Sequence, residues 1–236
     1  MSLLLNNAML VLGGNNLSGI MNAVALSYKA VALENTRFGA NTKNMLGGLK
    51  EVSVSAKGYW DSAYDAALFS DVGNGDIITA AAQGGTEGNV AYFLQVLAAE
   101  YQTGTKVGEN LPFSLTADAQ GNLIRGLIAA NRTGITASGT GTGFNLGAVA
   151  SGQSLWAALH VLSATGTTPS LEMVIQGASS NTFSAPTSVL TFAPMAVPGA
   201  LFASVAGPLA ETWYRGDWTI TGTTPDFAFL LAMGIQ

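Results

Sequence analysis

The sequence predicts a mainly β protein, an antiparallel sandwich or barrel with one flanking helix and long loops. Two observations carry this prediction. Twenty-nine glycines divide the 236 residues into short segments rich in Val, Ile, Leu, Thr and aromatic residues, which is the pattern of strands joined by turns. Several of these segments also alternate apolar and hydrophilic residues with the period of two that a half-buried strand requires.

The alternation is clearest in three segments, 51–57, 113–118 and 171–175. In the first of them we expect Val54 and its alternate neighbours to face the core. The hydrophilic sides of the first two segments carry small polar or acidic side chains, namely Ser53, Ser55, Ser114, Thr116 and Asp118.

Two further segments, Leu155–Leu162 and Phe227–Met233, are apolar on both sides of the predicted strand. Such strands need cover on both faces. A central strand of the chain's own core is the favoured interpretation, and a face covered by a neighbouring subunit is the alternative.

One helix is predicted at about residues 61–71, because Asp61 suits the N-cap position and Gly73 follows the end of the segment. Residues 89–101 also lack Gly and Pro. They fit a second helix or a strand, and we favour the strand.

Two stretches are predicted to be long loops, one at about residues 33–50 and a glycine-rich one at about 137–152. Loops of this length are usually functional or disordered. Lys29, Arg37, Lys43 and Lys50 lie in or near the first stretch, which suggests an arm that reaches for an acidic partner surface, with a solvated loop as the alternative. We find no convincing repeat or linker and expect a single domain over 1–236.

The composition indicates an assembly subunit. Only 10% of the residues are charged, 48% are hydrophobic and the mean hydropathy is +0.35, whereas a soluble domain has about 25% charged residues. Much of the surface is therefore expected to be uncharged and covered by other copies. A formal charge of -5 is opposite to the footprint of a nucleic-acid-binding protein.

Other features of the sequence indicate the cellular compartment in which the protein folds. The chain has no cysteine and no apolar run of about 20 residues that could form a membrane-spanning helix. The N-terminus lacks the charged region of a signal peptide. We expect assembly in the cytoplasm and no membrane partner.

No catalytic, cofactor-binding or metal-binding site is predicted. The only histidine, His160, lies in an apolar segment and is more typical of a satisfied core or interface residue than of a general base. The acidic stretch 71–76 lacks the terminal Glu of a calcium loop, and GTGTG at 139–143 lacks the Gly-Lys-Ser/Thr of a phosphate loop. The aromatic residues of 211–218 fit a strand in which Tyr214, Trp218 and Ile220 are buried better than a platform for sugars.

The order of short motifs resembles the tail tube (major tail) proteins of long-tailed bacteriophages. Leu17-Ser18 begins a turn that leads to a strand at Val24–Tyr28, and an acidic residue with a nearby Thr follows at Glu34 and Thr36. A loop with Gly39 and Lys43 then leads to Gly48-Leu49-Lys50 and a second strand before the helix. The later segments FSLTADAQGNLIRG, LHV and FAFLLAMG continue the resemblance.

This resemblance implies a structural subunit that forms six-membered rings, which stack into the hollow tube of a virion tail. DNA would pass through without specific binding, and tape measure, terminator and tip proteins would be further partners. The arm would bridge neighbouring rings through Arg37, Phe38, Lys43, Met45, Leu46 and Lys50. The hydrophilic sides of the clean strands (Ser53, Ser55, Ser114, Thr116, Asp118) would line the channel, unless they face the outside.

Two other functions stay open from the sequence. A capsid decoration or head–tail joining protein would share the β fold and the low charge. A carbohydrate-binding module would use Trp213, Tyr214 and Trp218, and it requires these rings to be exposed.

Overall fold

The computed structural model describes residues 7–236 and confirms a mainly β fold with one short helix. Residues 1–6 lie outside the described part. They belong to the N-terminal segment in which we expected no signal peptide. The chain forms two compact units. Unit 1 contains the residues up to Gly19, Gly75–Gln95 and Gly121–Gln236, and unit 2 contains Ile20–Asn74 and Val96–Gln120. The single domain over 1–236 stays a prediction.

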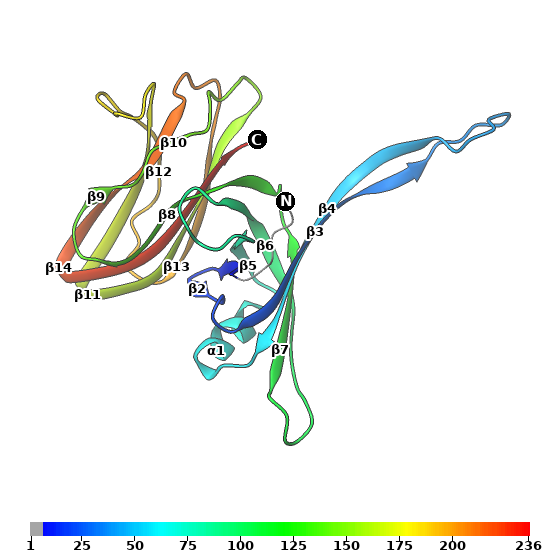
Figure 1. Cartoon of the computed structure of the whole chain (residues 1–236), viewed down its shortest axis with the longest axis horizontal. Coiled ribbons are helices and arrows are strands. Elements are labelled where there is room, and N and C mark those ends of the chain that lie inside the picture. Colours follow the sequence, from blue (N-terminus) through cyan, green and yellow to red (C-terminus); the bar gives the residue numbers. More distant parts are fainter. Residues whose placement is uncertain (1–6) are drawn as a thin grey trace. The chain divides into compact units, whose positions relative to one another are not determined.

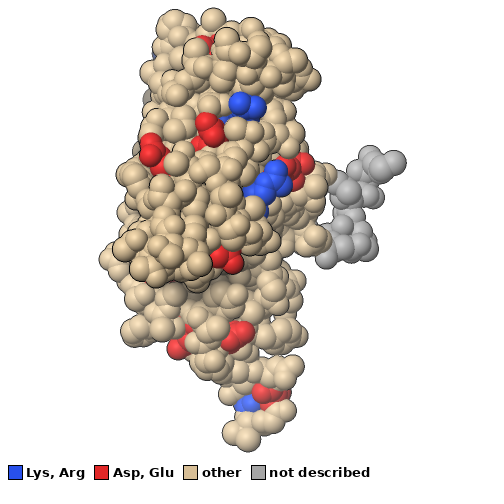
Figure 2. All heavy atoms as spheres, turned by 90° about the vertical axis from the view of Figure 1, so that its left-hand side faces the viewer, with Lys and Arg blue, Asp and Glu red and all other residues tan. Residues whose placement is uncertain are grey.

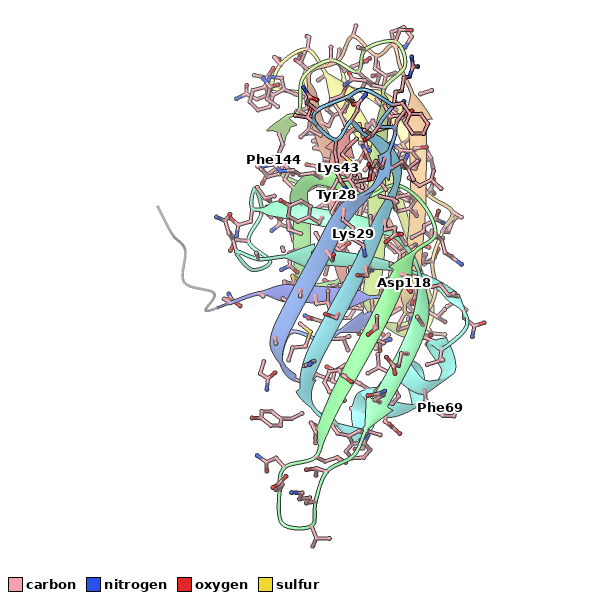
Figure 3. The ribbon with its side chains drawn as sticks, turned by 90° about the vertical axis from the view of Figure 1, so that its right-hand side faces the viewer. Tyr28, Lys29, Lys43, Phe69, Asp118 and Phe144 are labelled. Atoms are coloured by element: carbon pink, nitrogen blue, oxygen red, sulfur yellow. The ribbon has the colours of Figure 1, made fainter. Side chains whose placement is uncertain are left out.

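Unit 2 is a four-stranded antiparallel sheet with a helix. Its strand order is β3-β4-β7-β6, with β6 contributing only its second half. The elements are β3 (Met21–Glu34), β4 (Met45–Tyr59), α1 (Ser62–Asp71), β6 (Val90–Thr103) and β7 (Pro112–Ala119). Figure 3 shows β3, β4 and β7 side by side.

The predicted helix and strand orientation in unit 2 are confirmed. The Asp61 carboxylate caps α1 by accepting a hydrogen bond from the backbone N–H of Ala63 at 2.9 Å, which satisfies one of the free donors of the first turn. Val54 is 2% exposed. Its alternate neighbours on β4 and the corresponding residues of β7 are also buried, namely Val52, Ala56, Phe113, Leu115 and Ala117.

Unit 1 is formed almost entirely by strands. β12, β11, β14, β8 and the first half of β6 are hydrogen-bonded neighbours in that order, β13 pairs with β11, and β9 and β10 pair with β14. β5 pairs with β1, which pairs with β2. The bounds are β1 (Met9–Leu12), β2 (Asn15–Asn16), β5 (Gly75–Ala81), β8 (Ile124–Ile135), β9 (Gly139–Thr140), β10 (Phe144–Asn145), β11 (Ser154–Ala178), β12 (Thr187–Thr191), β13 (Gly199–Ala206) and β14 (Trp213–Ile235).

The long strands β11 and β14 pair with each other and are buried on both faces over the two segments that the sequence singled out. Leu159 and Leu231 belong to one apolar cluster, whereas Ala158 and Leu230 belong to a second. The favoured prediction, central strands within the chain's own core, is therefore confirmed for both segments.

A repeat that the sequence analysis missed lies where β11 and β14 change register. Thr165–Pro169 and Thr221–Pro225 both read TGTTP, and Thr167 pairs with Thr223. Gly166 and Gly222 have φ of +114° and +121°, and Thr168 and Thr224 have φ of +49° and +48°. A Cβ on Gly166 would lie 2.6 Å from the carbonyl oxygen of Thr224, and one on Gly222 would lie 2.8 Å from that of Thr168.

Three predicted segments have a clear outcome. Residues 89–101 are indeed a strand, most of β6. The predicted loop at 33–50 is wrong at both ends, because β3 continues to Glu34 and β4 begins at Met45, which leaves only residues 35–44 as a turn. Residues 137–152 are mostly irregular but include the two-residue strands β9 and β10.

Candidate functional site

One face of the unit 2 sheet is hydrophilic and made of small side chains. Across β4 and β7, Ser53 pairs with Asp118 and Ser55 with Thr116, and Lys57 pairs with Ser114. Directly paired residues of an antiparallel sheet share a face, so the structure gathers all five predicted channel residues on one side. Asp118, labelled in Figure 3, is exposed, and the other four are half-buried by their neighbours in the sheet.

Charges of both signs border this face. Lys29 Nζ lies 3.0 Å from Glu51 Oε2 in a cross-strand ion pair. Glu100, on the neighbouring strand β6, pairs with Thr116. With acidic and basic groups interspersed, the face lacks the concentrated positive charge that would hold a phosphate backbone.

The outer part of β3 and β4 is a second distinct surface, here called the distal hairpin (residues 28–51). β4 pairs with β7 only from Ser53 to Tyr59, so its first residues pair with β3 alone. Figure 1 shows the two strands continuing past the end of β7. Of thirteen large apolar side chains exposed in the described chain, seven lie here: Tyr28, Val31, Leu33, Phe38, Met45, Leu46 and Leu49.

All six predicted arm residues lie on the distal hairpin and are exposed. Lys43 Nζ forms an ion pair with Glu34 Oε2 at 3.0 Å, and Lys50 Nζ lies 5.6 Å from the centre of the Tyr28 ring. Met45 and Leu46 are about half exposed, and Phe38 is fully exposed. Among the described residues, the Arg37 guanidinium has no hydrogen-bond or ion-pair partner.

Helix α1 is held to the sheet by one carboxylate. Trp60 Nε1 and Tyr101 Oη each donate a hydrogen bond to Asp65 Oδ1 at 2.8 Å. Burial, together with the hydrogen bond to Asp65, raises the pKa of Tyr101 to about 12. Leu68 is fully buried on the same helix. The helix therefore has a fixed orientation within unit 2.

The last turn of α1 and the residue after it form a surface that the sequence analysis missed, here called the α1 end (Phe69, Asp71, Val72). Phe69 is 74% exposed and Val72 41%. Partial burial raises the pKa of the Asp71 carboxyl, and no partner for that carboxylate lies within residues 7–236. The sequence held a signal for this surface, since residues 58–105 contain no Lys, Arg or His.

His160 is a satisfied core residue, as expected. In unit 1 its Nδ1–H donates to the carbonyl oxygen of Gly13 at 2.8 Å, which leaves Nε2 to accept from the Thr79 hydroxyl at 2.7 Å. Burial lowers the pKa of His160 to about 4. The imidazole is therefore neutral near pH 7 and inaccessible to a substrate.

The exposed aromatic platform that a carbohydrate-binding module requires is contradicted. Tyr214 is fully buried and Trp218 is 6% exposed, because both lie on the inward side of β14. The Trp218 Nε1–H donates a hydrogen bond to the carbonyl oxygen of Ala137 at 3.2 Å, which fixes the start of the glycine-rich loop.

The remaining sequence candidates have ordinary structural roles. Residues 71–76 form the end of α1, a turn and the start of β5, and GTGTG begins with strand β9. Within residues 7–236, no three His, Cys, Asp or Glu side chains are placed to hold a metal ion. The described helix is also too short to cross a membrane.

The fold class is thus an antiparallel β protein with one short helix. No protein-family model and no curated protein matches the sequence. Among solved structures, 52% of this chain matches 97% of a chain from the virion of a native gene transfer agent particle, with 15% identity and a TM-score of 0.44. A second match, from the tail of an empty gene transfer agent particle solved with C6 symmetry, covers 48% of this chain and 92% of the other, with 14% identity and a TM-score of 0.40.

Proposed function

We propose that this protein is a structural subunit of a phage virion tail, which assembles into rings stacked as a hollow tube. The distal hairpin carries the proposal. A two-stranded hairpin is only marginally stable in water, and a contiguous exposed apolar patch marks an interaction surface. Seven large apolar side chains on such a hairpin are best explained if another subunit covers them.

The hydrophilic face of unit 2 supports a channel lining. Its serine and threonine side chains are uncharged and its charges are of both signs, so a DNA backbone would pass without adhering. Six copies of a chain with formal charge -5 would carry about -30, six times that value, which disfavours DNA binding further. In this proposal Ser53, Ser55, Ser114, Thr116 and Asp118 line the lumen.

The number six, the location in the virion tail and the further partners come from the family resemblance. Tape measure, terminator and tip proteins would contact the assembled tube, and DNA would move through it during infection. The subunit would be assembled in the host cytoplasm and would have no catalytic role.

Electron microscopy of the purified protein tests this function. We expect hollow cylinders of uniform diameter that lengthen with protein concentration. Discrete trimers or monomers would instead indicate a capsid decoration or head–tail joining protein. In a reconstruction of the cylinder, a lumen lined mainly by Lys or Arg would contradict the proposed conduit.

A further inference from the structure

The turn of the distal hairpin presents a cation beside an aromatic ring. Arg37 has no partner among the described residues, and the adjacent Phe38 is fully exposed. The other basic residue of the turn, Lys43, is already paired with Glu34. Arg37 is thus the charge at this tip that is free to bind another surface.

The α1 end has the complementary chemistry. Phe69 and Val72 are exposed apolar side chains on either side of Asp71 in the sequence, whose carboxylate has no partner in the described chain. The carbonyl end of a helix carries a partial negative charge that favours a cation, yet the last turn of α1 contains no basic residue. An arginine with a neighbouring aromatic ring would satisfy both the charge and the apolar surface.

The two surfaces cannot meet within one copy. The tip immediately precedes β4 and α1 follows it, and β4 is an unbroken strand of 15 residues. At about 3.3 Å per residue such a strand separates its ends by roughly 45 Å. Figure 3 accordingly shows Lys43 and Phe69 at opposite ends of the unit 2 sheet.

We propose that Arg37 and Phe38 of one copy dock on the α1 end of the next copy, with Arg37 paired to Asp71. This inference rests on the proposed function, and it names the surface that receives the hairpin. The contact joins two different surfaces, so it can repeat from copy to copy, and between stacked rings this repetition would continue along the tube. Each copy then offers one tip and one α1 end.

Disulfide cross-linking tests the contact, because the chain contains no cysteine of its own. The double variant Phe38→Cys/Val72→Cys should form a ladder of covalent multimers when its assemblies are oxidised and run on a non-reducing gel. Both side chains are exposed, so folding should be unaffected. The matched control is Phe38→Cys/Val107→Cys, in which the second cysteine lies on the exposed loop between β6 and β7.

The outcomes separate this inference from the proposed function. A ladder from the 38/72 pair alone supports docking on the α1 end. Tubes that give no such ladder, or a ladder from the 38/107 pair instead, overturn the docking and leave the tube function intact. A wild-type chain that never polymerises overturns both.

Charge reversal provides a second test. Arg37→Glu and Asp71→Lys should each raise the concentration needed for tubes by about tenfold or more, because each leaves an unpaired charge at the contact. The double variant should recover most of the loss, and Lys106→Glu on the control loop should have no effect. Single reversals that polymerise like the wild type would exclude the Arg37–Asp71 pair.

Discussion

The β11–β14 pair of unit 1 and the distal hairpin of unit 2 are both long antiparallel ladders with many apolar residues, but they are covered differently. Every residue from Phe229 to Met233 of β14 is buried, with apolar clusters on both faces. The distal hairpin instead exposes Leu33, Met45, Leu46 and Leu49 by half or more. The first ladder is covered by its own chain over these segments, whereas the second is left exposed in the single chain.

The exposed apolar hairpin agrees with the low charge content of the molecule, in which only 10% of the residues are charged. Figure 2 shows one face of the molecule where charged side chains of both signs are few and most of the surface is uncharged. Apolar residues thus fill the core of unit 1 and also lie exposed on the distal hairpin of unit 2.

The largest expected effect on stability is a difference between substitutions at the two ends of a single strand, β4. Val54→Asp places a charge at a position that is 2% exposed and should cost more than about 4 kcal/mol, enough to prevent folding of unit 2. Leu49→Asp changes a side chain that is 85% exposed and should alter stability by less than about 0.5 kcal/mol. Thermal unfolding measures both, and equal losses would refute the comparison.

Acid should destabilise the covered unit through His160. Its pKa is about 4 in the folded chain against an ordinary 6.5, so between these values only the unfolded chain takes up the proton. The contribution of neutral His160 to the free energy of unfolding is fully present above pH 6.5. It falls by about 3 kcal/mol as the pH drops to 4. Urea unfolding of His160→Gln should show a smaller fall over that range, and an identical pH dependence would exclude this role.

The change of register between β11 and β14 lies in an exposed part of this ladder and depends on its paired glycines. Gly166→Ala should lose about 2 kcal/mol or more, because the methyl group would meet the Thr224 carbonyl oxygen in a backbone conformation with positive φ. Gly147→Ala is the control, with φ of +84° but no atom within 4 Å, and it should lose only about 1 kcal/mol, the cost of a Cβ at positive φ. If calorimetry finds equal losses, the close approach is unimportant.

The smallest effect on stability belongs to the uncovered ladder. Replacing residues 35–44 with Asn-Gly keeps the pairing of Glu34 with Met45 and suits a two-residue hairpin. The unfolding free energy should change by less than about 0.5 kcal/mol, while tube formation falls sharply. A deletion of Phe38–Gly47 would be a less specific test, because it would also remove the start of β4. Tubes of normal length would exclude the arm role.

The sequence predicted most of the core, because strand burial depends on a period of two that is visible in the chain. Val54, Leu115 and Met173 all lie on the buried side of their strands. The helix was also predictable, since its cap at Asp61 is a local interaction. His160 was correctly placed because a lone histidine among apolar residues must satisfy both ring nitrogens within the core.

The outer parts of β3 and β4 could not be predicted in this way. Their pairing is made by backbone hydrogen bonds, and Gly47 and Gly48 interrupt the alternation that would reveal a strand. The α1 end was missed for a different reason. Its character depends on an absence of basic residues over 58–105, whereas sequence motifs consist of residues that are present.

The facing TGTTP segments of β11 and β14 constrain each other's sequence, although they lie far apart in the chain. Each glycine makes room for the carbonyl of the other segment's threonine, so a change in either segment alters the fit of both. In related sequences, these two pentapeptides should therefore be kept together or lost together. A relative that retained only one of them would have to accommodate the change of register in another way.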